Sequence, residues 1–201
     1  GVATFSGLGI TGLPGTYTIT YSSGSLTNSS QTISLAKADQ TITFSAPTGR
    51  PWSATAFAVT PTSSSGLNVS LSSTTSSICT VSALDVSMVT VGSCSLTATQ
   101  AGNDYFNAAV SVSRSFTISQ ASQSITFAAP TDRSWSASTF TVAPTASSDL
   151  AVSLTSTSTG ICTVSSFTVT MVKAGTCTLS TSQSGNANYV SATSVTHSFE
   201  I

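Results

Sequence analysis

The sequence predicts an all-β protein made of two tandem β-sandwiches, each closed by one disulfide. Three observations predict this fold class: an internal repeat, a series of short alternating strands, and cysteines that recur two to a repeat. Residues 40–118 align with residues 123–201 at a constant offset of 83 positions, without a gap. A fixed period of this size is typical of a tandem array of similar domains.

Each repeat opens with a strand pattern, Gln40-Thr41-Ile42-Thr43-Phe44, in which Ile42 and Phe44 point to one face. Pro47 ends this strand, because proline cannot donate to a β-ladder. Apolar residues then alternate with polar ones through segments 57–59, 67–71, 79–81, 86–88, 94–98, 110–112 and 116–118. Seven or eight short strands without any helical period predict a β-sandwich.

The four cysteines are Cys79, Cys94, Cys162 and Cys177. Four cysteines allow three pairings, and the repeat symmetry favours Cys79–Cys94 and Cys162–Cys177. A zinc site would need closely spaced Cys and His ligands, and the chain's one histidine lacks a Cys-x-x-Cys partner. Disulfides indicate an oxidising compartment, and closing each loop contributes about 3 kcal/mol in the chain-entropy model.

The disulfide also predicts how the strands are divided between sheets. If strands 78–83, 86–91 and 94–100 formed one flat meander, the first and third would lie about 9.6 Å apart. A disulfide needs Cα atoms roughly 4.4–6.8 Å apart. The third strand is therefore expected to cross to the opposite sheet, as strands of immunoglobulin-like sandwiches do.

The repeat boundaries predict the domain organisation. Residues 40–118 and 123–201 are expected to be immunoglobulin-like domains joined by a linker at 119–122, and residues 36–39 form a similar linker ahead of the first. Strand patterns at 2–5, 15–21 and 31–35 are too few for both faces of a sandwich. We interpret residues 1–39 as the C-terminal part of a preceding domain; the alternative is a small sheet packed on the first repeat.

Composition excludes several classes of function. Only five Lys/Arg and six Asp/Glu are present, for a net charge of −1. This charge offers no basic face for nucleic acid and no polybasic segment for a membrane surface. No apolar run is long enough to span a bilayer. Serine and threonine supply the polarity, at about two residues in five. A hydrophobic fraction of 39% with so little charge argues against a disordered stalk.

The ordered motifs resemble those of bacterial immunoglobulin-like repeats of large surface and secreted proteins. The motifs are Gln40-Thr41-Ile42-Thr43-Phe44, Ile78-Cys79-Thr80-Val81, Gly92-Ser93-Cys94, Gln100-Ala101-Gly102-Asn103 and Ser115-Phe116-Thr117-Ile118, each with its counterpart in the second copy. Residues 1–39 resemble the last strands of another repeat type found in such proteins. The resemblance implies spacer or stalk segments of adhesins and exported proteins. One segment departs from the family's pattern: Arg50-Pro51-Trp52-Ser53 and its copy Arg133-Ser134-Trp135-Ser136.

That segment holds the candidate contact residues Arg50, Trp52, Arg133 and Trp135. An exposed tryptophan in each domain suits stacking on a sugar ring or insertion into a neighbouring subunit. The alternative, which we favour, is a tryptophan over the end of the sandwich with its arginine stacked on it as a cation–π pair. Tyr105-Phe106 and Tyr189 follow a Gly-Asn turn and fit either a tyrosine corner or ordinary core packing.

The residues for catalysis or metal binding are missing from the pattern. A nucleophilic serine needs a base and an orienting group, and His197 falls on the polar side of the last strand, where we expect it to be solvated. The acidic residues are scattered singly, whereas calcium needs six or more oxygen ligands, usually several of them carboxylates. We therefore expect no enzymatic activity, no metal site and no cofactor.

Two functional hypotheses remain. The first is a structural spacer in a long extracellular or cell-surface bacterial protein or filament, whose partners are neighbouring immunoglobulin-like domains of the same chain. Sparsely charged edge strands and an incomplete N-terminal domain also suit self-association by strand addition. The second is an adhesive module that contacts glycan or another surface through the Trp52 and Trp135 loops.

Overall fold

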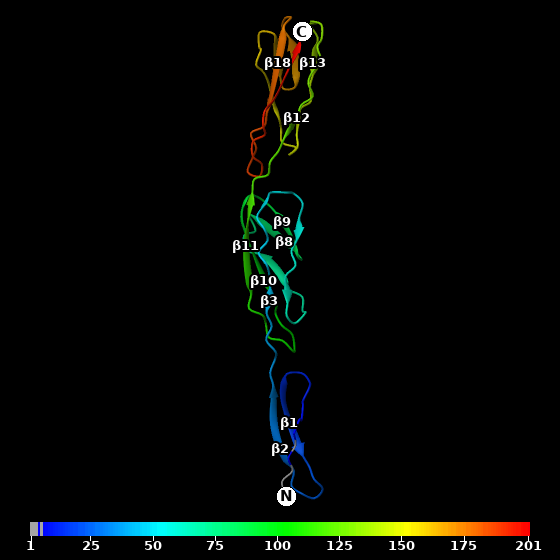
Figure 1. Ribbon diagram of the computed structural model, residues 1–201, viewed down its shortest axis with the longest axis vertical. Coiled ribbons are helices and arrows are strands. Elements are labelled where there is room, and N and C mark those ends of the chain that lie inside the picture. The colour runs from blue at the N-terminus through cyan, green and yellow to red at the C-terminus, as the bar shows by residue number, and fades with distance from the viewer. Residues whose placement is uncertain (1–3, 5) are drawn as a thin grey trace.

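The computed structural model describes residue 4 and residues 6–201, and it is elongated (Figure 1). An N-terminal hairpin and two sandwiches follow one another along the long axis. The strand expected at residues 2–5 falls mainly on positions outside the described residues. No described residue is helical.

The N-terminal hairpin pairs β1 (Gly15–Tyr21) with β2 (Ser29–Leu35) in antiparallel register. Most side chains of both strands are exposed. The Tyr17 hydroxyl donates a 2.6 Å hydrogen bond back to the Leu13 carbonyl, just ahead of the strand. A tyrosine tied to the backbone upstream of its strand is a hallmark of one corner of immunoglobulin sandwiches.

The first sandwich has two main layers. One sheet has the order β4-β11-β10-β7, the other has the order β5-β9-β8, and β3 pairs with β6. The strands are β3 (Ile42–Thr43), β4 (Arg50–Pro51), β5 (Phe57–Ala58), β6 (Thr62–Ser63), β7 (Ser70–Ser73), β8 (Cys79–Ser82), β9 (Asp85–Met88), β10 (Gly92–Thr99) and β11 (Val112–Ser119).

The second sandwich repeats this plan with sheets β15-β18-β19 and β13-β17-β16 and the pair β12-β14. Its strands are β12 (Ile125–Thr126), β13 (Thr139–Thr141), β14 (Thr145–Ala146), β15 (Ser153–Ser156), β16 (Cys162–Ser165), β17 (Thr168–Met171), β18 (Thr176–Ser182) and β19 (Val195–Glu200).

The core follows the alternation in the sequence. Along β10, Cys94, Leu96 and Ala98 are fully buried while the residues between them are not. Ile42 and Phe44 are buried and the threonines between and before them are exposed, as predicted. Burying a leucine such as Leu96 contributes about 1.5–3 kcal/mol, so one face of each strand supplies most of the stabilisation.

Val110 was expected in a strand, and here the prediction is wrong. The strand β11 begins only at Val112, and the Val110 side chain is 86% exposed. The N–H of Ala109 donates to the Gln100 carbonyl in a loop contact rather than a strand ladder. An apolar residue in an unpaired loop mimics strand alternation in the sequence without lying on the sheet.

Both disulfides join the two sheets of their sandwich. Cys79 on β8 bonds Cys94 on β10, and Cys162 on β16 bonds Cys177 on β18, with Cα atoms 5.7 Å apart in each pair. The strand that follows the β8–β9 hairpin therefore crosses to the opposite sheet. The predicted fold class, all-β immunoglobulin-like sandwiches with one disulfide each, is confirmed.

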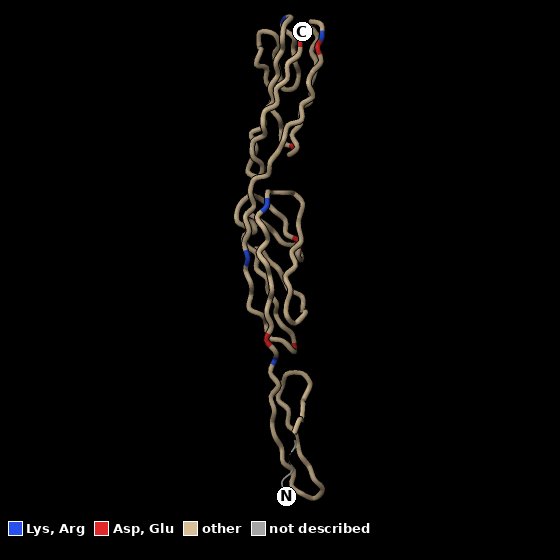
Figure 2. Tube along the Cα trace, in the orientation of Figure 1, with Lys and Arg blue, Asp and Glu red and all other residues tan. Residues whose placement is uncertain are grey.

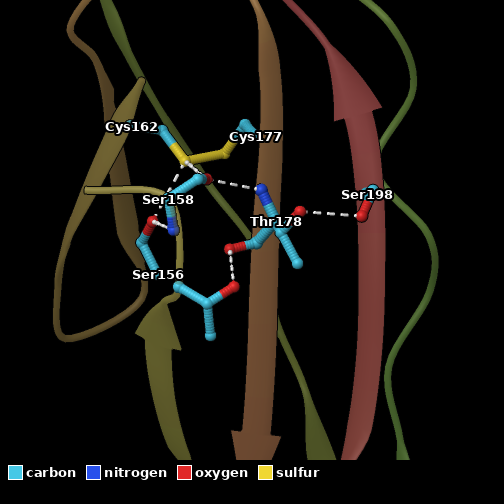
Figure 3. Close-up of a disulfide and its surroundings, with 7 residues drawn as sticks. Ser156, Ser158, Cys162, Cys177, Thr178 and Ser198 are labelled. Carbon is cyan, nitrogen blue, oxygen red and sulfur yellow. Dashed lines mark hydrogen bonds between the residues drawn. A yellow bond between two sulfur atoms is a disulfide. The ribbon is translucent and has the colours of Figure 1, made fainter. Parts of the chain in front are cut away.

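In each sandwich a hydroxyl group from the loop just before the first cysteine bonds the strand that carries the second cysteine, as Figure 3 shows for Cys162 and Cys177. In the second sandwich the N–H of Thr178, next to Cys177, donates a 2.8 Å bond to the Ser158 hydroxyl. In the first, the N–H of Ser95 donates to the Thr75 hydroxyl at 2.9 Å. Part of the high Ser/Thr content thus satisfies backbone groups where the chain changes sheets.

Candidate functional site

The described residues hold no cluster of three His, Cys, Asp or Glu side chains suited to a metal ion. No helix in the described part of the chain is long and apolar enough to cross a bilayer. Charged residues are few and lie mainly near the first linker and at the far end of the second sandwich, and the hairpin β1–β2 carries none (Figure 2).

His197 is placed differently from the prediction. It is half-buried rather than solvated: its Nε2 atom lies 3.0 Å from the Phe127 carbonyl, and its ring packs against the Phe127 ring. The equivalent Arg114 donates from Nε to the Phe44 carbonyl at 3.0 Å. Both side chains therefore link the last strand to the segment that opens the sandwich, a structural role that two different residue types fulfil.

The predicted stacking of arginine on tryptophan is also wrong. Arg50 stacks on Phe57, 3.4 Å from the ring centroid, and Arg133 stacks on Phe140 at 3.6 Å. Strand β4 ends at Pro51, so Trp52 leaves the sheet instead of continuing on the face that Arg50 occupies. Each arginine lies against its own sandwich, and the tryptophans extend to the end of it.

The two tryptophans differ in their surroundings. Trp52 is half-buried against its sandwich and also contacts Tyr189 of the second sandwich, edge to face, with ring centroids 5.4 Å apart. Trp135 is 55% exposed. The segment 50–53 therefore lies where the first sandwich meets the second, a contact region that we call the junction. Its copy, 133–136, lies at the far end of the second sandwich.

The carbonyl of Val89 is the polar centre of the junction. It follows β9 at the end of the first sandwich and accepts two hydrogen bonds, from Trp52 Nε1 and from Asn188 Nδ2, each at 3.3 Å. The backbone N–H of Trp52 donates to the carbonyl of Ser119, at the start of the linker, at 2.8 Å. Groups from the first sandwich, the linker and the second sandwich thus meet at one point.

The linker is paired with the second sandwich rather than free. Ala121 forms a parallel bridge with Tyr189: its N–H donates to the Asn188 carbonyl at 2.9 Å, and its carbonyl accepts from the Val190 N–H at 3.0 Å. The first linker does the same, with Ala38 bonded to Tyr105 and Asn107. Such pairing removes the rotational freedom that an unpaired four-residue linker keeps.

The loop that carries Asn188 and Tyr189 is internally fixed. Gly185 has φ +79°, and a Cβ there would lie 2.3 Å from the Tyr189 carbonyl oxygen, so only glycine fits. The Asn186 side chain accepts from the N–H groups of Asn188 and Tyr189 at 2.8 and 2.9 Å. The loop therefore presents these two side chains in a defined position before any partner is met.

Sequence reasoning missed this junction. It placed Tyr189 in a tyrosine corner or in the core, whereas Tyr189 packs on the neighbouring sandwich, and the corner hydrogen bond belongs to Tyr17. The signal for Tyr17 was present, because the turn residues Gly12-Leu13-Pro14 come immediately before its strand.

Neither a protein-family model nor a curated protein sequence matches the chain. Among solved structures it is similar to mouse protocadherin-24 EC1-3, with 11% identity and a TM-score of 0.35 over 92% of this chain and 78% of that one. Drosophila N-cadherin EC1-4 gives 12% identity and 0.31 over 91% of this chain and 56% of that one. The S-layer protein rSbsC(31-844) has 15% identity and a TM-score of 0.35, over 85% of this chain and 29% of that one. Likeness at this level carries no argument about function.

Proposed function

We propose that the chain is a stiff spacer segment of a longer extracellular protein, in which successive immunoglobulin-like domains are held in line by their junctions. The single observation that carries this proposal is the junction itself, where Trp52 and Asn188 both donate to the Val89 carbonyl and Tyr189 packs on the Trp52 ring. A flexible tether would need none of these contacts.

The proposed domains are residues 40–118 and 123–201, with 119–122 as the linker and 1–39 as the C-terminal part of a further domain. The two separate core clusters support the first two. The hydrogen bond from Tyr17 to Leu13 supports the assignment of residues 1–39. Such a tyrosine corner lies at the start of the sixth strand of an immunoglobulin sandwich, near the C-terminal end of the domain. The exposed faces of β1 and β2 would then be covered by the other strands of that domain.

An extracellular or cell-surface location is supported by the two buried disulfides, because disulfides persist in oxidising compartments. The low charge supports a spacer role, since a junction built from aromatic and hydroxyl groups has few charges for salt to screen. A bacterial source and a filament remain parts of the proposal that rest on the resemblance of the motifs.

The junction contacts are strong enough to bias the orientation of the two sandwiches. The edge-to-face pair of Trp52 and Tyr189 contributes about 0.5–1.5 kcal/mol, and the hydrogen bond from Asn188 to Val89, which crosses the junction, contributes about 1 kcal/mol. Together they contribute about 1.5–2.5 kcal/mol, a roughly 10- to 70-fold preference for the docked arrangement.

Small-angle X-ray scattering of the whole chain tests the proposal. We expect an extended, rigid particle whose maximum dimension changes little between low and high salt. Trp52→Ala and Tyr189→Ala each remove the aromatic pair, so scattering should report a shorter average length and greater flexibility. Trp135→Ala is the matched control and should leave the profile unchanged. A native profile already as flexible as that of the Tyr189→Ala variant would overturn the proposal.

A further inference from the structure

The far end of the second sandwich exposes two large apolar side chains. Trp135 is 55% exposed and Val172 47%. We call these two residues the end face. Their counterparts at the 83-residue offset are Trp52 and Val89, which lie at the end of the first sandwich where the junction forms.

The backbone of the end face matches that of the occupied junction. The Val89 N–H bonds the Ile78 carbonyl at 2.9 Å, and the Val172 N–H bonds the Ile161 carbonyl at 2.8 Å. The Val172 carbonyl is therefore held in the same way as the carbonyl that accepts both junction bonds.

The Trp135 side chain lacks the partners that its counterpart has, whereas Val172 and Val89 are equally exposed, at 47% and 46%. Trp52 has Tyr189 against its ring and the Val89 carbonyl at its Nε1 atom. Among the residues that the structure describes, the indole of Trp135 makes no hydrogen bond or ring contact. The same backbone is thus present twice, and the tryptophan beside it has partners at the junction and none at the end face.

We propose that the end face is a docking site for the Gly-Asn loop of a further copy of this repeat, with Trp135 receiving an aromatic residue and the Val172 carbonyl receiving a side-chain donor. This inference rests on the proposed spacer function and names the surface through which the array continues. The loop chemistry is specific: Gly185-Asn186-Ala187-Asn188-Tyr189 offers an amide donor followed by an aromatic ring.

The loop of the first repeat shows what the docking position tolerates. Gly102-Asn103-Asp104-Tyr105-Phe106 places Tyr105 where the second repeat has Asn188, and Phe106 where it has Tyr189. Gly102 has φ +78°, and its Asn103 side chain accepts from the N–H groups of Tyr105 and Phe106, as in the second loop. Both loops therefore carry an aromatic ring at the Tyr189 position, whereas only the loop of the second repeat carries an amide donor at the Asn188 position.

The test uses the whole chain extended by one repeat, so that Ile201 is followed by a second copy of residues 119–201. Trp52 and the tryptophan of the added copy are changed to Phe, which leaves Trp135 as the single tryptophan. We expect its fluorescence maximum to move to shorter wavelength, and acrylamide quenching to fall several-fold, relative to the 201-residue chain carrying Trp52→Phe. In the added copy, the changes equivalent to Asn188→Ala and Tyr189→Ala should restore the exposed values.

Trp135 quenched equally in the extended and the 201-residue chains would overturn the proposal. It would also fall if the changes equivalent to Asn188→Ala and Tyr189→Ala in the added copy left Trp135 as well protected as the unaltered copy does. Neither outcome touches the spacer function, because the scattering test depends on Trp52 and Tyr189 in the 201-residue chain. Amide chemical shifts of Trp135 and Val172 give a second readout, and they should change only with the unaltered loop.

Discussion

Removing one disulfide should destabilise its own sandwich and leave the other in place. The perturbation is Cys162→Ala with Cys177→Ala, and the matched control is Cys79→Ala with Cys94→Ala. All four cysteines are fully buried, and both pairs close loops of sequence separation 15. Alanine is preferred to serine, because it leaves no buried hydroxyl without a partner.

The magnitude follows from the loop length. Releasing a loop of about 15 residues costs about 3 kcal/mol of unfolding free energy in the chain-entropy model. For a domain of 60–100 residues this lowers Tm by roughly 12–24 °C. The two variants should lose similar amounts, since the two loops are equal in length and join equivalent strands.

Differential scanning calorimetry, with amide exchange to assign each transition, is the assay. We expect the transition of the altered sandwich to move down and the other to stay within a few degrees. A loss below about 1 kcal/mol would refute the reasoning that the bridges constrain the unfolded chain. Equal movement of both transitions would refute the independence of the two cores.

Two further predictions concern local backbone contacts. Gly185→Ala should lower the unfolding free energy by more than 2 kcal/mol and expose Trp52 to quenching, because the new Cβ would lie 2.3 Å from the Tyr189 carbonyl oxygen. Gly66→Ala is the control: Gly66 has φ +76° and open space around it, so the loss should be only about 1 kcal/mol. Tyr17→Phe removes the hydrogen bond to Leu13, which contributes about 1 kcal/mol, so amide exchange in the hairpin should become about fivefold faster. Neither calorimetric transition should change. Unchanged exchange would show that the corner bond contributes nothing.

The layers of each sandwich were predictable because their cause is local. Alternation around Ile42 and Leu96 indicates which face is buried, and the spacing of Cys79 and Cys94 requires the strand that follows the hairpin to change sheets. Val110 shows the limit of this reasoning: alternation continues into a loop where no strand pairs with it.

The junction was not predictable because it joins residues from different repeats. Comparing the copies aligns Trp52 with Trp135 and Phe106 with Tyr189, but alignment does not reveal which end of one sandwich meets which loop of the next. The same comparison treats both tryptophans as equivalent, whereas one is at an occupied junction and the other is exposed. Position along the array, rather than residue type, separates them.

The central claim is that the junction holds the two sandwiches in one relative orientation. Residual dipolar couplings, measured for both sandwiches of the native chain in a weakly aligning medium, test it most directly. The account predicts one shared alignment tensor for the two cores, which separates into two different tensors in the Tyr189→Ala variant. Two tensors of different magnitude in the native chain, unchanged by Tyr189→Ala, would contradict it.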